Sequence, residues 1–245
     1  MTAHDLTIRS HDVSPGVRLL TINRPERKNA FDQRTYHGLA DALTSAANDD
    51  STHIVVVTGE GNVFSGGQDL PEMAAMARGE LTGANGFPTL LNALETFAKP
   101  LIAAVNGAAT GIGATMLLHC DLVYLSSSAR LRFPFAEMGV PPEAGASALL
   151  PDLVGSQIAA ELLFTARWIS AIEAVQLGLA RAEFASEELL PNVFSIAGTI
   201  ASRSPSAVQT AKRLMLEARG DRSGAARKRE EAGFAALFAS QRNAG

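Results

Sequence analysis

Short apolar runs alternate with segments of helical periodicity through the first half of the chain. Residues 32–47 carry apolar side chains three and four positions apart, which predicts an amphipathic helix. Residues 53–58 (HIVVVT) are almost wholly apolar, as in a strand covered on both faces. The same pattern predicts strands at 5–10, 17–23, 101–105, 122–125 and 181–184, an extended piece at 129–135, a linker at 78–88, and helices from Pro71, at 89–98 and over most of the chain from residue 148. Strands that alternate with helices and then give way to helices alone indicate an α/β core with a helical C-terminal region.

Two glycine-rich segments each follow an apolar strand. Residues 106–114 (NGAATGIGA) follow the strand at 101–105 and lead into an apolar helix, and residues 64–70 (FSGGQDL) follow the strand at 53–58. The first N–H groups of a helix have no intrahelical partner and carry the positive end of its dipole, so such a turn is suited to receive negative charge. Two main-chain N–H donors that converge from separate loops can hold a thioester oxygen as it becomes an enolate.

Composition and charge restrict the class of protein. The 245 residues, 47% hydrophobic and 19% charged, are ordinary for one main domain with a sizeable core. The net charge of -4 disfavours a nucleic-acid partner, and we expect the basic run at 227–229 to lie on a solvated helix face. The single cysteine, Cys120, cannot form an internal disulfide, and no apolar run reaches about 18 residues. We therefore expect a cytoplasmic protein with no membrane partner.

Several other catalytic patterns are incomplete. TGIGA at 110–114 resembles part of a dehydrogenase fingerprint, but G-x-G-x-x-G is not complete, and Ala40 and Ser128 stand where a Tyr-x-x-x-Lys pair needs lysine. No serine lies in a G-x-S-x-G elbow, and a Walker-type phosphate loop is absent. The histidines lack metal-ligand spacing, and His119 is interpreted as a helix-end residue. These observations exclude the common dehydrogenase, serine hydrolase and metal-site patterns.

The two glycine turns and their surroundings resemble the crotonase (enoyl-CoA hydratase/isomerase) superfamily. The resemblance covers nearly the whole chain, because NRPERKNAF at 23–31, CDLVY at 120–124 and RWISAIEAVQLGLA at 167–180 occur in the family's order around both turns. It implies an α/β crotonase (ClpP/crotonase-like) fold, a spiral of β-β-α units with a helical C-terminal region. It also implies an acyl-CoA thioester substrate and no separate cofactor, since coenzyme A is part of that substrate.

The acidic residues predict which reaction of the family takes place. Its hydratases use two glutamates, and the corresponding positions here are Thr115 and Phe135. Residues 134–151 (PFAEMGVPPEAGASALLP) are instead similar to monofunctional peroxisomal-type 3,2-enoyl-CoA isomerases, whose single catalytic glutamate matches Glu143. One carboxylate is sufficient, because a proton removed from C2 can be returned to C4 on the same face. Apolar neighbours are expected to raise the pKa of Glu143.

The resemblance also assigns groups that would hold the substrate. The oxyanion hole falls on the backbone N–H groups of Gln68 and Ile112. Arg27 and Lys28 lie where the family approaches the phosphates of coenzyme A, and Asp69 is expected to fix its loop by bonding backbone amides. Further substrate-binding positions are predicted at Ala30, Ser65, Gly66, Gly67, Leu70, Gly111 and Phe135, together with Asp69.

Assembly and function follow as further expectations. Family members are usually trimers or dimers of trimers, so we expect residues 1–190 to form the core domain and residues 191–245 a helical trimerisation region. Relatives usually continue into a helix that carries an aromatic and a basic residue, whereas this sequence ends at SQRNAG, so contacts from such a helix are not assigned. The function expected is that of a 3,2-trans-enoyl-CoA isomerase. A hydratase, another crotonase-type acyl-CoA isomerase and a non-catalytic acyl-CoA-binding relative remain alternatives.

Overall fold

A six-stranded sheet forms the centre of the protein. The computed structural model describes residues 6–80, 85–219 and 221–243. The strand order is β1-β2-β3-β5-β7-β10, in which only the β1–β2 pair is antiparallel. Its strands are β1 (Ile8–Ser14), β2 (Gly16–Ile22), β3 (Thr52–Gly59), β5 (Leu101–Val105), β7 (Leu122–Ser126) and β10 (Ala182–Phe184). Five of these strands agree closely with the ones that the hydrophobic pattern predicts, whereas β1 was predicted at 5–10 and instead extends to Ser14.

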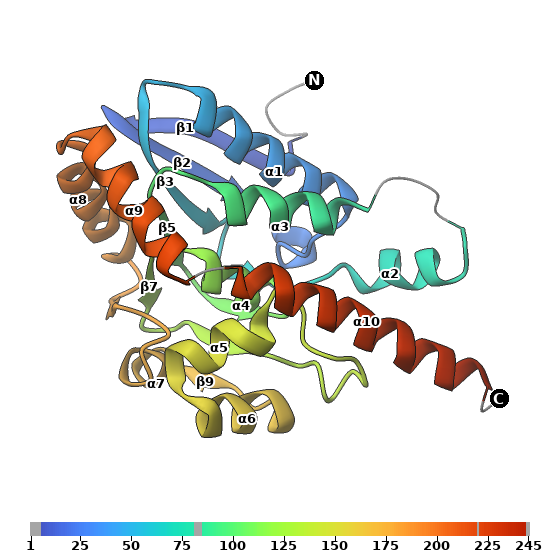
Figure 1. Ribbon diagram of the computed structural model, residues 1–245. Coiled ribbons are helices and arrows are strands. Elements are labelled where there is room, and N and C mark those ends of the chain that lie inside the picture. The colour runs from blue at the N-terminus through green and yellow to red at the C-terminus, as the bar shows by residue number, and fades with distance from the viewer. Residues whose placement is uncertain (1–5, 81–84, 220, 244–245) are drawn as a thin grey trace.

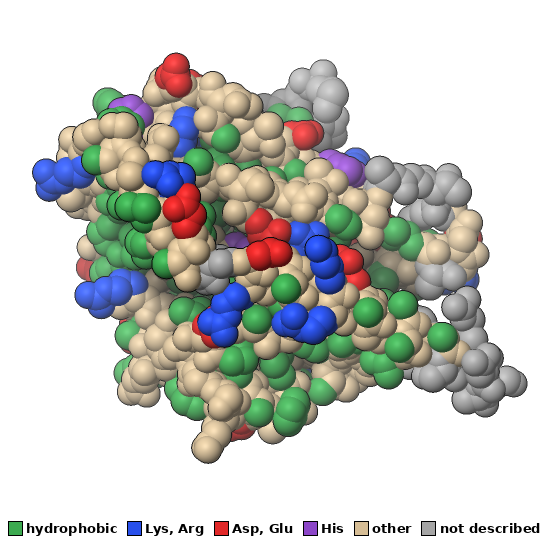
Figure 2. All heavy atoms as spheres, viewed as in Figure 1, with side chains coloured by type: hydrophobic (Ala, Val, Ile, Leu, Met, Phe, Trp, Pro, Cys, Tyr) green, Lys and Arg blue, Asp and Glu red, His purple; other side chains and the backbone are tan. Residues whose placement is uncertain are grey.

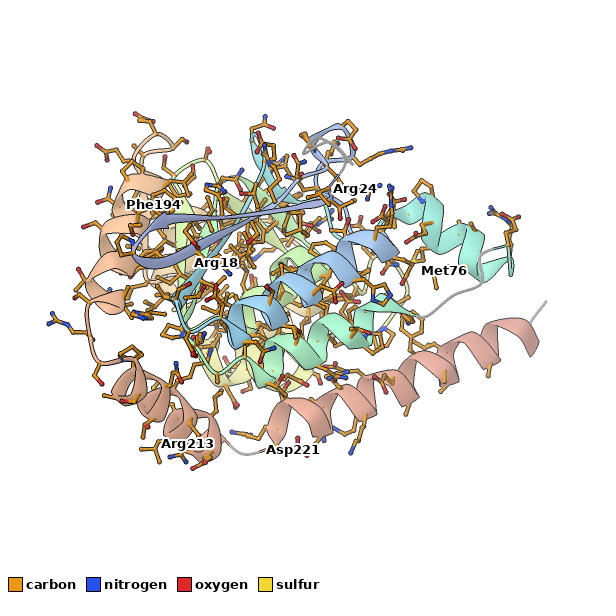
Figure 3. The ribbon with its side chains drawn as sticks, turned by 90° about the horizontal axis from the view of Figure 1, so that it is seen from above. Arg18, Arg24, Met76, Phe194, Arg213 and Asp221 are labelled. Carbon is orange, nitrogen blue, oxygen red and sulfur yellow. The ribbon has the colours of Figure 1, made fainter. Side chains whose placement is uncertain are left out.

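Helices cover both faces of this sheet. Along β3, Val55 and Val57 pack in the cluster that contains α1 and α3, whereas Ile54 and Val56 pack against α8. Because successive side chains of a strand point to opposite faces, this arrangement explains the unbroken apolar run at 53–58. The helices are η1 (Pro25–Arg27), α1 (Gln33–Asn48), α2 (Leu70–Ala77), α3 (Gly86–Thr96), α4 (Ile112–Thr115), η2 (Met116–His119), α5 (Ala146–Val154), α6 (Ser156–Thr165), α7 (Ala171–Gln176), α8 (Leu189–Ala201), α9 (Pro205–Arg219) and α10 (Arg222–Asn243). Figures 1 and 3 show α1 and α3 side by side over one face.

A second sheet of very short strands was not predicted. Its order is β4-β6-β8-β9, with the first three strands parallel, and it consists of β4 (Val63–Ser65), β6 (Ala108–Thr110), β8 (Arg130–Arg132) and β9 (Ile169–Ser170). Each of β3, β5 and β7 is followed in the chain by one short strand of this sheet and then by a helix. The chain therefore repeats a β-β-α unit, as expected. Sequence periodicity misses β4, β6 and β9 because strands of two or three residues contain too few positions to show it.

Several predicted boundaries differ from the structure. The helix expected after the second glycine pair ends after four residues and continues as the 3-10 helix η2 before the chain turns into β7. Helix α3 begins at Gly86, within the predicted linker, because the side chain of Asn85 accepts a hydrogen bond from the N–H of Phe87 and caps the helix. Residues 81–84 of that linker lie outside the described residues. The expected domain boundary at residue 190 falls within α8.

Helix α10 lies against α5 and is bonded to α3. The Ser223 hydroxyl and the Arg227 guanidinium both donate to the Glu95 carboxylate, over 2.5 and 2.6 Å. Figure 2 shows acidic and basic side chains gathered at the centre of this face. Arg227 is thus half-buried and paired, contrary to the expected solvated face, whereas Lys228 and Arg229 are exposed as expected. Among the described residues, no helix has both the length and the apolar character needed to cross a membrane.

Candidate active site

The predicted catalytic residues follow three neighbouring strands of the small sheet. The chain leaves β4 into the loop of Gln68, β6 into the turn before Ile112, and β8 into the long loop that ends at Glu143. Because β4, β6 and β8 are parallel neighbours, their carboxyl ends lie at one edge of the sheet. Ligands of α/β proteins bind at this edge of a parallel sheet. The fold therefore directs all three segments to the same side of the molecule.

The backbone N–H of Gln68 is directed by a bridge to Phe31. The N–H of Phe31 donates to the carbonyl oxygen of Gly67 over 2.8 Å, and the N–H of Asp69 donates to the carbonyl oxygen of Phe31 over 2.9 Å. In extended chain, successive N–H groups point in opposite directions. The N–H of Gln68 therefore points away from Phe31.

The backbone N–H of Ile112 opens helix α4. Gly111 precedes it with φ +54°, and the N–H of the first helical residue has no intrahelical partner. The two glycine loops touch, since a Cβ on Gly67 would come within 2.8 Å of the carbonyl oxygen that precedes Gly111. A Cβ on Gly113 would come within 2.7 Å of the Cβ of Ser65. Only glycine fits at positions 67 and 113, because the two loops approach each other so closely there.

A buried ion-pair network holds the loop that contains Gln68. The Asp69 carboxylate accepts a hydrogen bond from the N–H of Glu72 and thereby caps α2. It also pairs with the guanidinium of Arg24 at 3.0 Å, and the same guanidinium lies 3.3 Å from Asp32. Figure 3 shows Arg24 beside the start of α2. In this geometry, Asp69 holds its loop through a backbone amide and an ion pair.

Asn29 and Ser65 join the neighbouring loops through main-chain groups. The Asn29 amide donates to the carbonyl oxygens of Glu60 and Val63, over 2.9 and 2.7 Å. The Ser65 hydroxyl donates to the carbonyl oxygen of Asn29 and accepts a bond from the N–H of Gly67. Ser65 is fully buried. Its hydroxyl therefore joins the two loops through their main-chain groups. The prediction that Ser65 binds substrate gains no support from these contacts.

Tyr36 interacts with both Gln68 and Glu143. The hydroxyl of this fully buried tyrosine donates to Oε1 of Gln68 over 3.1 Å. Burial raises the pKa of Tyr36 well above its usual value, and the neighbouring Glu143 carboxylate raises it further. The pKa of Glu143 is itself raised to about 8, first by burial and then by the carboxylate of Glu230. The site thus combines main-chain donors with a carboxyl whose pKa suits proton transfer near neutral pH.

Comparison with known proteins identifies the family. The family model described as "Enoyl-CoA hydratase/isomerase" matches residues 12–244. The chain belongs to this family, the crotonase superfamily. This protein is therefore an enzyme that acts on enoyl-CoA thioesters. Its α/β crotonase fold, with two mixed sheets and C-terminal helices, confirms the fold predicted from the sequence.

Individual crotonase relatives carry the names of different reactions. The chain is 37% identical to "2,3-dehydroadipyl-CoA hydratase" of Escherichia coli K12 over 82% of this chain and 78% of the relative. It is 36% identical to "Enoyl-CoA delta isomerase 2" of Rattus norvegicus over 82% of this chain and 52% of the relative. A crystal structure of an enoyl-CoA hydratase/isomerase from Pseudoalteromonas atlantica T6c superimposes with a TM-score of 0.89, at 38% identity, over 95% of this chain and 92% of that one.

The two positions expected to hold hydratase acids are buried and uncharged in this crotonase. Thr115 is fully buried and its hydroxyl donates to the carbonyl oxygen of Gly111 over 3.3 Å. Phe135 is 4% exposed and packs in the main core. Glu137, the other acid of this loop, is exposed and pairs with Arg132. Glu143 is therefore the acid of the loop that lies near Tyr36.

The remaining predicted substrate-binding positions lie around the edge of the site. Arg27 and Lys28 are exposed at the end of η1, and Leu70 is exposed at the start of α2. The N–H of Gly66 donates to the carbonyl oxygen of Lys28 over 2.8 Å, so these loops lie side by side. Ala30 is partly buried in the same segment. Contacts between these positions and coenzyme A stay predictions.

Sequence reasoning misses three residues that organise the site. Tyr36 is predicted only as an apolar position of its helix, and its contact with Gln68 leaves no signal in the sequence. Asn29 lies within NRPERKNAF, and its positive φ of 54° is a conformation that asparagine tolerates well, so the motif contained a usable signal. Glu230 follows the basic run and is 7% exposed.

Among the described residues, no group of three or more His, Cys, Asp or Glu side chains is arranged to hold a metal ion.

Proposed function

We propose that the protein is a 3,2-trans-enoyl-CoA isomerase in which Glu143 alone moves the proton. The observation that carries the proposal is the combination of one carboxyl of raised pKa near Tyr36 with uncharged side chains at Thr115 and Phe135. Addition of water would need an acid to hold and activate it. Migration of a double bond requires only one group that accepts and returns a proton.

The reaction proceeds through a thioester dienolate. The Glu143 carboxylate removes a proton from C2 of a 3-enoyl-CoA, and the electron pair of that C–H bond forms the C2–C1 double bond while charge moves to the thioester oxygen. The N–H groups of Gln68 and Ile112 stabilise that oxygen. The protonated Glu143 then delivers the proton to C4. The electron pair of the C3–C4 double bond forms the new C4–H bond, and the C1–C2 pair forms the C2–C3 double bond. The charge on the oxygen restores the thioester carbonyl, and the carboxylate is regenerated.

The raised pKa of Glu143 fits this role. A base is most effective when its pKa lies near the working pH, because it then combines a useful ionised fraction with a strong tendency to take the proton. The protonated intermediate must also survive long enough to return the proton to C4. A pKa of about 8 favours that intermediate more than the usual value of 4.5 would.

The test is incubation of the purified protein with 3-enoyl-CoA and 2-enoyl-CoA esters of several chain lengths. Isomerisation creates the near-ultraviolet absorbance of a conjugated enoyl thioester without a change in mass. Hydration removes that absorbance and adds the mass of one water. Formation of the 2-enoyl ester from the 3-enoyl ester supports the proposal, whereas water addition to the 2-enoyl ester with no movement of a double bond would refute it.

Substrate contacts, assembly and location extend the proposal. We infer that Arg27 and Lys28 approach the phosphates of coenzyme A, supported by their exposure beside the Gly66 loop. We also propose a homotrimer or dimer of trimers assembled through residues 191–245, in the cytoplasm. Light scattering after size-exclusion chromatography measures the number of subunits, and a monomer would contradict this assembly.

A further inference from the structure

The loop that carries Glu143 has an unusual backbone. Ala144 and Gly145 both adopt left-handed conformations, with φ values of +59° and +75°. The carbonyl oxygen of Glu143 accepts a bond from the N–H of Ala146, the first residue of α5. A left-handed residue other than glycine persists only where surrounding contacts enforce it. The direction of the Glu143 side chain therefore depends on whatever holds this pair of residues.

Two buried side chains from distant parts of the chain hold the loop. Oε2 of Glu230 accepts a hydrogen bond from the N–H of Gly145, and Oε1 accepts one from the N–H of Ser147, both over 2.8 Å. From the other side, Nε2 of His119 donates to the carbonyl oxygen of Ala144 over 2.8 Å. Glu230 is 7% exposed, so its carboxylate lies within the protein and not in solvent.

We propose that Glu230 of α10 is a positioning residue for the base Glu143, through its two hydrogen bonds to the loop that follows Glu143. This inference rests on the proposed function in naming Glu143 as the base. Both oxygens of the carboxylate accept N–H groups at the start of α5, where anions bind favourably. Glu230 thereby fixes the left-handed turn, and the turn fixes the direction of the Glu143 side chain.

The charge of Glu230 adds a second, measurable effect. Its carboxylate lies near enough to Glu143 to raise the pKa of that group in addition to burial. Other ionisable groups also face this region. They are Tyr36 of α1, Glu72 of α2, the Glu95–Arg227 pair of α3 and α10, and His119 of η2. Removal of the Glu230 charge should therefore lower the pKa of Glu143.

The test compares Glu230→Gln with Glu231→Gln. The first removes a buried charge and keeps the side-chain size, and the second makes the same change at the exposed neighbouring position. Carbon-13 NMR of the labelled Glu143 carboxyl, assigned by its loss in Glu143→Gln, gives its pKa without turnover. In Glu230→Gln we expect a lower pKa, a matching shift of the acid limb of kcat/KM to lower pH, and a fall in kcat of about 10- to 100-fold with KM little changed. Glu231→Gln should resemble the wild type.

A second variant separates position from charge. Glu230→Asp keeps the charge but is too short to reach both N–H groups, so kcat should fall while the pKa of Glu143 stays raised. This variant carries the test if Glu230→Gln does not fold. Unchanged Glu143 titration in a folded Glu230→Gln, or unchanged kcat in either folded variant, would overturn the proposal. Because the NMR titration needs no substrate, it can be measured even if the protein has no isomerase activity. The lack of activity would refute the proposed function, whereas a shift of the Glu143 pKa in Glu230→Gln would still support the role of Glu230.

Discussion

The hydroxyl of Tyr36 donates a hydrogen bond to Oε1 of Gln68 over 3.1 Å. This bond joins the buried face of α1 to the loop whose main-chain N–H forms half of the candidate oxyanion hole. The Glu143 carboxylate also raises the pKa of the same tyrosine, so Tyr36 interacts with both the candidate base and the loop of the candidate donor.

Removal of that hydroxyl should loosen the Gln68 loop. We expect Tyr36→Phe to lower the free energy of unfolding by about 1 kcal/mol, the usual net value of one hydrogen bond, and kcat by on the order of tenfold through displacement of the donor. Chemical denaturation and steady-state kinetics measure the two effects. Tyr124→Phe, on β7 and on the α8 side of the large sheet, is the control and should leave kcat unchanged. Equal kcat values for Tyr36→Phe and the wild type would contradict a role for the bond.

Glu143 should carry the proton transfer. We expect Glu143→Gln to lower turnover of a 3-enoyl-CoA by about 10² to 10⁴, since the amide cannot accept the proton from C2. Binding of an acyl-CoA, measured by calorimetry, should change little. Glu137→Gln, at the exposed acid of the same loop, provides the matched control. A Glu143→Gln variant with near-normal turnover would remove Glu143 from the mechanism.

The raised pKa of Glu143 also makes a prediction about stability. Its pKa is about 8 in the folded protein and about 4.5 in the unfolded chain, so the folded state binds the proton more tightly between these values. The free energy of unfolding should therefore fall as pH rises from about 4.5 to 8. Glu143→Gln lacks this ionisation, so its Tm should match the wild type below pH 4.5 and exceed it increasingly toward pH 8. Parallel Tm profiles would show that Glu143 has an ordinary pKa.

Gly113 should be intolerant of a side chain. Its Cβ would lie 2.7 Å from the Cβ of Ser65 and 2.9 Å from the carbonyl oxygen of that residue, so Gly113→Ala must push the two glycine loops apart. We expect it to cost about 1–3 kcal/mol as an overpacking substitution and to lower kcat by displacing the N–H of Ile112. Gly198→Ala in α8 meets open space and should instead stabilise the protein by about 0.4–1 kcal/mol. Equal Tm values for the two variants would contradict the close approach of the loops.

Arg24 should be essential to the stability of the segments that it joins through Asp69 and Asp32. Its removal leaves the buried carboxylates of Asp69 and Asp32 without their shared partner, so Arg24→Met should cost about 3–5 kcal/mol. Arg78→Met breaks the exposed pair with Glu80 and should change stability little. Urea denaturation of both variants measures the difference. A small effect at Arg24 would mean that the two acids find other partners or become protonated.

The long elements of the fold were predictable because local patterns specify them. The run at 53–58 and the strand at 101–105 correspond to β3 and β5, and the periodic segment at 32–47 corresponds to α1. The short strands of the second sheet were not predictable in this way. A three-residue strand such as β6 is determined by its pairing with β4 and β8, segments more than twenty residues away along the chain, and not by its own composition.

The candidate site also has parts that the sequence predicts and parts that it does not. The sequence motifs locate Gln68, Ile112 and Glu143, and the parallel strands place their segments at one edge of the small sheet. The supporting contacts are long-range, and nothing local in the sequence indicates them. Tyr36 is 32 positions from Gln68, and Glu230 is 85 positions from Gly145. Such pairs depend on which helix faces which loop, and this is known only once the fold is formed.

The distance between Gly145 and Glu230 along the chain affects the order in which the site is completed during synthesis. Proteins are made from the N-terminus, so the loops of Gln68 and Ile112 leave the ribosome long before α10 does. Until α10 has been made, the N–H groups of Gly145 and Ser147 lack their carboxylate partner. We therefore expect a nascent chain to assemble the candidate donors for the thioester oxygen first and to fix the candidate base only after α10 has been made.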